Sequence, residues 1–169
     1  MIRDEAAGDA PAIRVVLEEA FGTPVEAGLV DALRASCDDR LSLVAERDGD
    51  VVGHILFTPV EIDAAGGVLR GYGLAPMAVR AAWQRRGIGS ALIAEGTKRL
   101  REGGAPFVFV IGHPEYYPRF GFERASRHGV RCQWPEVPDE AVMLLVLDSA
   151  AAPRLGGVAR YRPEFDAAV

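Results

Sequence analysis

Residues 79–92 are the stretch that decides the fold, and they read Val-Arg-Ala-Ala-Trp-Gln-Arg-Arg-Gly-Ile-Gly-Ser-Ala-Leu. The stretch follows a predicted strand and opens a predicted helix. Backbone N–H groups in the first turn of a helix lack partners within the helix, and the helix dipole places positive charge there. Gly87 and Gly89 allow that backbone to approach an anion closely. The stretch therefore predicts a site for phosphate groups.

Three phosphate-binding motifs have glycines at comparable spacing, and the neighbouring residues separate them. A Walker loop carries a lysine before its final Ser or Thr, whereas here Gly89 directly precedes Ser90, which disfavours an ATPase. The dinucleotide fingerprint needs Gly or Ala where this chain has Leu92, and this stretch comes too late in the chain for it. The remaining pattern, Gln/Arg-x-x-Gly-x-Gly/Ala, is matched by residues 84–89.

Outward from this loop, hydrophobic periodicity and turn residues predict an alternating order of helices and strands. The predicted helices cover residues 9–21, 24–36 and 87–102, with a helical turn at 115–120. The predicted strands cover residues 41–46, 51–62, 68–79, 106–111 and 141–147, with turns at 48–49 and 64–67. Pro76 should interrupt pairing within its strand because proline has no N–H to donate. The order predicts one mixed α/β domain over residues 1–169, with an uncertain tail at 150–169.

Charge and composition exclude several classes of function. The net charge is −5 over 169 residues, which disfavours a protein that grips nucleic acid over its whole surface. Residues 80–101 are the exception, with six basic side chains against one acidic, and they indicate a local anionic ligand. No apolar run approaches the ~20 residues of a membrane span, and the N-terminus lacks a secretion signal. We therefore expect a cytoplasmic protein without a membrane partner, and Cys37 and Cys132 match no metal-binding spacing.

Two segments together resemble a known family. Residues 77–92 resemble the acyl-CoA-binding motif of the GNAT superfamily of N-acetyltransferases. Residues 113–122, which read His-Pro-Glu-Tyr-Tyr-Pro-Arg-Phe-Gly-Phe, resemble the family's Tyr-x-x-x-Gly-Phe signature. The pattern is most similar to the YhbS-like acetyltransferases, and the resemblance covers residues 3–147. It departs from the family at Met1–Glu5, where the usual first strand is short or absent.

The resemblance implies a fold and a donor. The fold is a mixed, mostly antiparallel central sheet that is splayed between strands four and five, with helices on both faces. The donor is acetyl-CoA, without a metal, and an amine attacks it directly in a ternary complex. The pyrophosphate and the pantetheine arm would bind mainly to backbone groups, with the oxyanion near Met77–Ala78. The residues expected to bind acetyl-CoA are Met77, Ala78, Val79, Gln84, Arg85, Arg86, Gly87, Ile88, Gly89 and Ser90.

Proton transfer needs an acid for the thiolate and an acceptor for the amine proton. Tyr117 aligns with the family's tyrosine, and an ordinary tyrosine pKa of ~10 keeps it protonated at neutral pH, so it is the predicted general acid. Tyr116 takes that role if the register differs by one residue. His113, at the exit of its strand, is the predicted second catalytic residue because histidine titrates near neutral pH. For His54 and Glu61, a hydrogen-bonded structural role and a solvated strand end are the simpler interpretations.

Two other functions remain open at this point. One is a module that binds or senses acyl-CoA without catalysis. The other is an acyltransferase that uses a carrier-protein thioester, for which the basic segment would supply a docking rim. For the main hypothesis, we expect a small-molecule or peptide amine as acceptor, no nucleic acid, and a homodimer as in many similar proteins.

Overall fold

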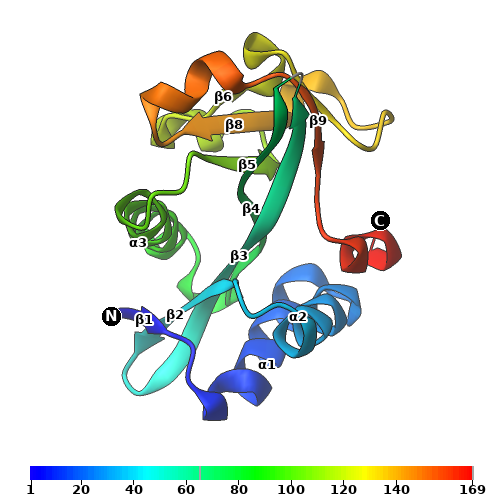
Figure 1. The fold of residues 1–169 in the computed structure, drawn as a ribbon. Coiled ribbons are helices and arrows are strands. Elements are labelled where there is room, and N and C mark those ends of the chain that lie inside the picture. Colours follow the sequence, from blue (N-terminus) through cyan, green and yellow to red (C-terminus); the bar gives the residue numbers. More distant parts are fainter. Residues whose placement is uncertain (65, 169) are drawn as a thin grey trace. The chain divides into compact units, whose positions relative to one another are not determined.

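Figure 1 shows the chain in a computed structural model, which describes residues 1–64 and 66–168. The α-helices are α1 (Ala10–Phe21), α2 (Val25–Ser36) and α3 (Ile88–Glu102). The strands are β1 (Ile2–Asp4), β2 (Leu41–Arg47), β3 (Asp50–Ala64), β4 (Gly67–Val79), β5 (Phe107–Ile111), β6 (Glu123–Arg124), β7 (Val130–Cys132), β8 (Val142–Val146) and β9 (Gly157–Arg160). Short 3-10 helices are η1 (Ala7–Asp9), η2 (Ala81–Trp83), η3 (Tyr117–Phe120), η4 (Ala125–His128), η5 (Asp139–Ala141), η6 (Ser149–Arg154) and η7 (Pro163–Ala168).

The helices and longer strands confirm the predicted order to within a few residues. The first strand is indeed short: β1 has three residues, which pair antiparallel with β2. Strands β6, β7 and β9 were not predicted, because strands of two to four residues are too short to show a period of two. The predicted turn at 64–67 includes residue 65, and the tail ends at residue 169, both of which lie outside the described residues.

The strands form a mixed sheet in the order β1-β2-β3-β4-β5-β8-β6, with β9 beside β3 and β7 beside β9. Most of the described pairs are antiparallel, whereas β4–β5 and β7–β9 are parallel. The register of β4 with β5 covers only Tyr72–Leu74 and Val108–Val110. It therefore ends before Pro76, where the sequence predicts a break in pairing.

The chain forms two compact units. The first comprises Met1–Thr58, Ala75–Gly96 and Pro163–Val169, and the second comprises Pro59–Leu74 and Thr97–Arg162. One domain over residues 1–169 stays a prediction.

In the first unit, helices cover both faces of β3. A Cβ placed at Gly53 would lie 3.2 Å from the side chains of Ile88 and Leu92, so α3 packs against this face. Side chains alternate along a strand, so His54 points to the opposite face, where hydrogen bonds connect it to Arg34 of α2. Figure 1 shows α1 beside α2. Cover on both faces explains why this part of β3 lacks the alternation of a half-exposed strand.

The second unit is built around β5, whose residues 107–110 are buried. Glycines on β4 accommodate large aromatic rings that pack against its backbone. A Cβ at Gly71 would lie 2.7 Å from the ring of Phe107, and one at Gly73 would lie 2.5 Å from the ring of Tyr161. The tail from residue 150 is therefore partly ordered into the core through Tyr161, which is 7% exposed.

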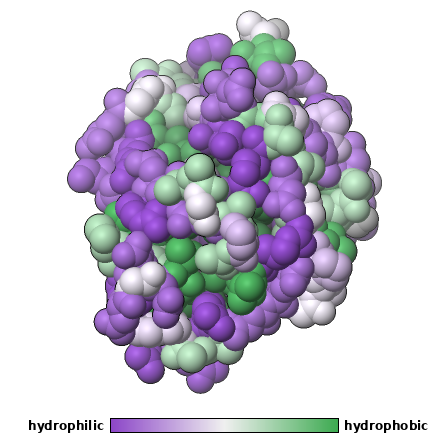
Figure 2. Space-filling model, turned by 90° about the horizontal axis from the view of Figure 1, so that it is seen from below, coloured by the Kyte–Doolittle hydropathy of each residue, from purple (hydrophilic) through white to green (hydrophobic). Residues whose placement is uncertain are grey.

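The face of the molecule seen in Figure 2 is mainly polar. Figure 2 shows one face on which hydrophilic side chains predominate around a smaller hydrophobic group. Large hydrophobic residues that are exposed within the described ranges are Met1, Val15, Phe21, Val25 and Val68. In the part of the chain that the structure describes, no helix has the length and apolar character needed to cross a membrane.

Candidate active site

The predicted phosphate loop connects β4 to α3 in the first unit. Its start is fixed to the sheet, because the N–H of Arg80 donates to the carbonyl oxygen of Val52 at 2.8 Å. The side chain of Gln84 turns back and donates from Nε2 to the carbonyl oxygen of Val79 at 3.0 Å. Gln84 thus braces the loop with its side chain. Two left-handed residues then complete the turn, Arg85 with φ 61° and Gly87 with φ 79°.

The backbone N–H groups of residues 85–90 are available to a ligand. None of them donates a hydrogen bond to another described residue, and the first bond of α3 runs from the N–H of Ala91 to the carbonyl oxygen of Gly87 at 3.0 Å. Residues 84–87 are exposed, and a Cβ at Gly87 would meet nothing within 4 Å. Unpaired N–H groups at the positive end of a helix dipole can bind an anion, so the phosphate site at this loop stays a prediction that this geometry allows.

The arginines near the loop differ in the groups that their side chains contact. Arg80 forms an ion pair with Glu19 of α1, with Nε 3.1 Å from Oε2. The guanidinium of Arg86 lies 5.1 Å from the centroid of the Trp83 ring, within the range of a cation–π contact. Arg85 is exposed and carries its side chain on a left-handed backbone. Arg85 and Arg86 are therefore the accessible cations of this loop.

Three residues that lead into the loop were predicted to hold the pantetheine arm. Ala78 is 5% exposed, whereas Met77 and Val79 are half-buried. The pairing of β4 with β5 ends at Leu74, so it does not occupy the backbone of these three residues. Their side chains have the burial of ordinary packing residues, so a binding role rests on their main chain.

The Tyr117 turn lies in the second unit and begins after β5. The carbonyl oxygen of His113 accepts hydrogen bonds from the N–H groups of Tyr116 at 3.1 Å and Tyr117 at 3.4 Å. A Cβ at Gly112 would lie 2.4 Å from Cε2 of Tyr117, so the ring packs directly on this glycine. The ring of Phe122 meets Tyr117 edge to face, with centroids 5.6 Å apart. The tyrosine is held rigidly by these contacts.

Burial keeps the phenol of Tyr117 protonated. Desolvation, with a smaller contribution from Tyr116, raises the pKa of Tyr117 to about 12. Its hydroxyl forms no hydrogen bond with another described residue. Tyr116 is half-buried and packs between Tyr117 and Phe120, with centroids 5.2 Å from each ring. Of the two neighbouring tyrosines, Tyr117 is therefore the more deeply buried one, and burial raises its pKa.

The candidate proton acceptors lie in contrasting surroundings. The side chain of His113 is exposed and makes no hydrogen bond or ion pair within the described part of the chain. Glu61 is also exposed and lies opposite Arg160 in the β3–β9 register. His54 is fully buried, and desolvation, the largest effect, lowers its pKa to about 4.

Sequence reasoning did not connect His54 with the groups that contact it. Nε2 of His54 lies 2.9 Å from Oγ of Ser42, and Ser42 donates to the carboxylate of Glu5. Glu5 and Ser42 are separated by 37 residues along the chain. A polar residue in each of two adjacent apolar strands, Ser42 in β2 and His54 in β3, is a signal that could have pointed to this cluster.

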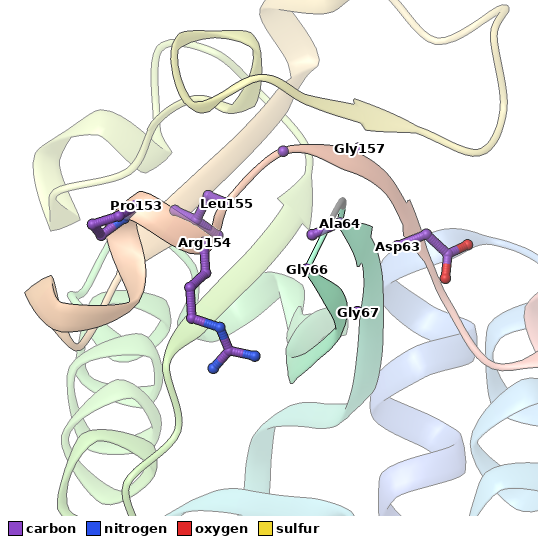
Figure 3. A pocket seen from close by; sticks show the side chains of 9 residues that line it. Asp63, Ala64, Gly66, Gly67, Pro153, Arg154, Leu155 and Gly157 are labelled. Atoms are coloured by element: carbon purple, nitrogen blue, oxygen red, sulfur yellow. The ribbon is translucent and has the colours of Figure 1, made fainter.

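A pocket of about 470 Å³ is lined by none of the predicted site residues (Figure 3). It is formed in the second unit by the ends of β3 and β4 and by the segment before β9. Its lining residues are Asp63, Ala64, Gly66, Gly67, Pro153, Arg154, Leu155, Gly156 and Gly157. Asp63 points away from the pocket and pairs with Arg160 at 3.2 Å. One remaining cation and glycine backbone do not define a reaction, so we assign this pocket no catalytic role.

Metal ligands do not gather in the described residues, which contain no group of three or more His, Cys, Asp or Glu side chains able to hold an ion.

A phosphate loop of this pattern, a β4–β5 pair that ends early and a tyrosine turn after β5 together define an acetyltransferase fold. The family described as the acetyltransferase (GNAT) domain matches residues 1–125. The chain belongs to this GNAT acetyltransferase family.

Relatives extend the match to nearly the whole chain. The uncharacterized N-acetyltransferase YhbS of Escherichia coli K12 is 36% identical over 167 residues, which cover 98% of each chain. A crystal structure of E. coli YhbS in complex with CoA matches with a TM-score of 0.90, 37% identity, and coverage of 98% of this chain and 91% of that chain. A GNAT acetyltransferase from Brucella melitensis in complex with acetyl-CoA matches with a TM-score of 0.80, 38% identity, and coverage of 98% and 97%.

Proposed function

We propose that this protein transfers an acetyl group from acetyl-CoA to a primary amine, which attacks the thioester directly in a ternary complex. The observation that carries the proposal is the set of unpaired N–H groups at residues 85–90, of which residues 85–87 are exposed. Relatives that are 37% and 38% identical were crystallised with CoA and acetyl-CoA. The loop has the chemistry that such a donor requires, because a pyrophosphate binds well at a helix N-terminus.

For donor binding, each part of the site has a separate role. The N–H groups of residues 85–90 bind the pyrophosphate, and Arg85 and Arg86 attract further phosphate oxygens. The backbone of Met77–Val79 pairs with the pantetheine arm as an added strand would. Gln84, although predicted to bind the donor, acts through its hydrogen bond to Val79, which shapes the loop.

The proposed reaction replaces the C–S bond of the thioester with a C–N bond to the amine. The amine nitrogen forms a bond to the thioester carbon, the C–S bond breaks, and the thiolate leaves. A backbone N–H near Met77–Ala78 stabilises the oxyanion. Tyr117 donates the proton that the thiolate takes up, and burial favours the neutral form of its phenol. The amine nitrogen loses one proton as it attacks, and the tyrosinate left at Tyr117 takes up one proton, so the amide and the free thiol form without a net change in protons. His113, the second residue predicted for catalysis, is exposed and accessible to substrate, and its role stays a prediction.

The test combines binding and turnover. Purified protein is mixed with acetyl-CoA and a panel of small amines and peptide amines, and free thiol is followed over time. Thiol release that depends on an amine supports the proposal. A rise in melting temperature with CoA but no turnover with any amine would instead support a module that binds acyl-CoA. Turnover with an acylated carrier protein but not with acetyl-CoA would support a carrier-dependent enzyme.

A further inference from the structure

The most unusual polar group of the first unit is His54, whose side chain is 0% exposed on β3. Its Nε2 atom lies 2.9 Å from Oγ of Ser42. The hydroxyl of Ser42 donates to one carboxylate oxygen of Glu5, and Nε of Arg34 donates to the other at 2.6 Å. These four residues form one hydrogen-bonded chain, which we call the His54 chain.

The donors and acceptors of the His54 chain define its direction. Because Ser42 uses its only proton toward Glu5, its oxygen accepts from Nε2–H of His54. This tautomer, assigned from the network, leaves Nδ1 with a lone pair. Nδ1 is buried and has no hydrogen-bond partner within the described part of the chain. A buried acceptor without a partner is unfavourable, so its retention calls for a reason.

The His54 chain adjoins the strand segment that holds the donor in the proposed function. β3 and β4 are neighbours in the sheet and follow one another through a short turn, so they run antiparallel. The N–H of Arg80, the residue after β4, donates to the carbonyl oxygen of Val52 on β3 at 2.8 Å, and this hydrogen bond fixes the register of the two strands. In antiparallel strands, a step of two residues forward on β3, from Val52 to His54, corresponds to a step of two residues back on the neighbouring chain segment, from Arg80 to Ala78. His54 is therefore placed beside Ala78, within the segment Met77–Val79.

Resting on the proposed function, we propose that the His54 chain carries away the proton that an acceptor amine arriving as ammonium must lose before its nitrogen attacks the thioester. Nδ1 of His54 receives this proton, and Nε2 passes its own proton to Oγ of Ser42. Ser42 passes its hydroxyl proton to the carboxylate of Glu5. The Glu5 side chain is 10% exposed and releases the proton to solvent. One proton enters and one leaves, and no oxidation or reduction is involved.

The charged groups around His54 suit a residue that passes protons on. Burial lowers its pKa most, Glu5 raises it, and Arg34 lowers it, with a net pKa of about 4. His54 is therefore neutral at pH 7 and has its lone pair available. The imidazolium is disfavoured, so a proton does not rest there. Arg34 is held by Asp31 at 2.7 Å as well as by Glu5, which keeps the far end of the chain ordered.

The test varies the basicity of the amine in the full-length protein. His54→Gln keeps a donor for Ser42 but cannot relay a proton. For an amine with a pKa near 10, which arrives as ammonium, we expect kcat to fall by about 10²-fold. For an amine with a pKa below the assay pH, which arrives neutral, we expect turnover close to wild type. A purely structural defect would reduce turnover with both amines equally, and that result would overturn the proposal.

Further variants keep the result interpretable. Glu5→Gln breaks the chain at its far end and should show the same dependence on amine pKa, even if His54→Gln folds poorly. Thr58→Val is a matched control, because Thr58 is also buried on β3 with an unpartnered hydroxyl but lies outside the chain. It should leave turnover unchanged with both amines. Melting temperatures of all variants show whether each one folds.

The outcomes separate this proposal from the proposed function. If wild type acetylates amines but His54→Gln and Glu5→Gln retain full turnover with the basic amine, the His54 chain is overturned and the enzyme activity stands. If His113→Gln alone shows the dependence on amine pKa, the proton acceptor is His113, and the proposal is also overturned. If wild type releases no thiol with any amine, the proposed function fails, and the His54 chain falls with it.

Discussion

The phosphate loop and the Tyr117 turn both depend on glycines, but they use them differently. In the phosphate loop, Gly87 has φ 79° and open space around its Cα, and the neighbouring N–H groups are unpaired. In the Tyr117 turn, Gly112 makes room for an aromatic ring of the same chain, which would lie 2.4 Å from an added Cβ. One region leaves its polar backbone open for a ligand, and the other fills its space with side chains.

This difference teaches how binding and catalysis are divided in the proposed function. The open loop supplies affinity through backbone groups, so single side chains contribute modestly. The packed turn supplies one fixed hydroxyl, so a single atom contributes much. Substitutions in the two regions should therefore differ in size and in the property that they change.

The largest expected effect is on Tyr117→Phe, which removes only the hydroxyl. Turnover should fall by about 10²–10⁴-fold while the melting temperature and CoA affinity stay near wild type. Steady-state kinetics measure turnover, a thermal melt gives the melting temperature, and calorimetry gives the CoA affinity. Tyr116→Phe is the matched control, and a larger loss there would transfer the role to Tyr116. Loss of CoA affinity without loss of kcat in Tyr117→Phe would contradict the division between the regions.

The same residue predicts a dependence on pH. The ordinary tyrosine pKa is 10.0, and burial raises that of Tyr117 to about 12. The unfolded chain therefore ionises this residue first, and the stability contributed by its neutral form is present below pH 10 and is lost as pH rises toward 12. Chemical denaturation from pH 9 upward should show a smaller decline for Tyr117→Phe than for wild type. Equal declines would show that the phenol is not buried in solution.

The next effect is on Gly112→Ala, which inserts a Cβ against the ring of Tyr117. Displacing the ring should destabilise the protein by about 1–3 kcal/mol and reduce turnover. Denaturant unfolding measures the first and thiol release the second. Gly28→Ala is a suitable control, because a Cβ there would meet nothing within 4 Å. Wild-type stability in Gly112→Ala would mean that the turn is looser than the packing indicates.

A smaller effect is expected for Arg86→Gln, which removes a cation from the phosphate loop. CoA affinity should fall roughly tenfold at low salt, and the difference should shrink as salt screens the charge. Calorimetry at two ionic strengths measures this. Arg119→Gln provides the control, because Arg119 stacks on Tyr116 at 4.8 Å much as Arg86 stacks on Trp83. An equal loss of affinity in both variants would argue against specific phosphate contact.

The smallest effect is expected for substitutions of Arg85, where stability and CoA affinity should change in opposite directions. Arg85 has φ 61°, a conformation that glycine adopts without strain. Arg85→Gly should raise the free energy of unfolding by a few tenths to about 1 kcal/mol, while CoA affinity falls because the guanidinium is lost. Arg85→Lys keeps the charge and should retain most of the affinity. A loss of stability in Arg85→Gly would show that the arginine side chain braces the loop.

Much of the fold was predictable because its signals are local. The long helices and strands follow from periodicity, and the phosphate loop follows from glycines between a strand and a helix. The short strands β6, β7 and β9 were not predictable, because their pairing depends on distant partners. The hydrogen bond from the Gln84 side chain to Val79 was not predictable either, because only the folded loop brings the two within reach, and donor binding by Gln84 stays a prediction.

The sequence by itself determined the class of protein, since residues 79–92 and 113–122 carry their chemistry in consecutive positions. Backbone N–H groups at a helix start need only the right local turn. The tertiary structure alone decided the burial and the partners of single side chains, because these arise between distant segments. It distinguished Tyr117 from Tyr116 by packing on Gly112 and Phe122. It also brought Glu5 and Ser42 to His54, and no local pattern encodes that hydrogen-bonded chain.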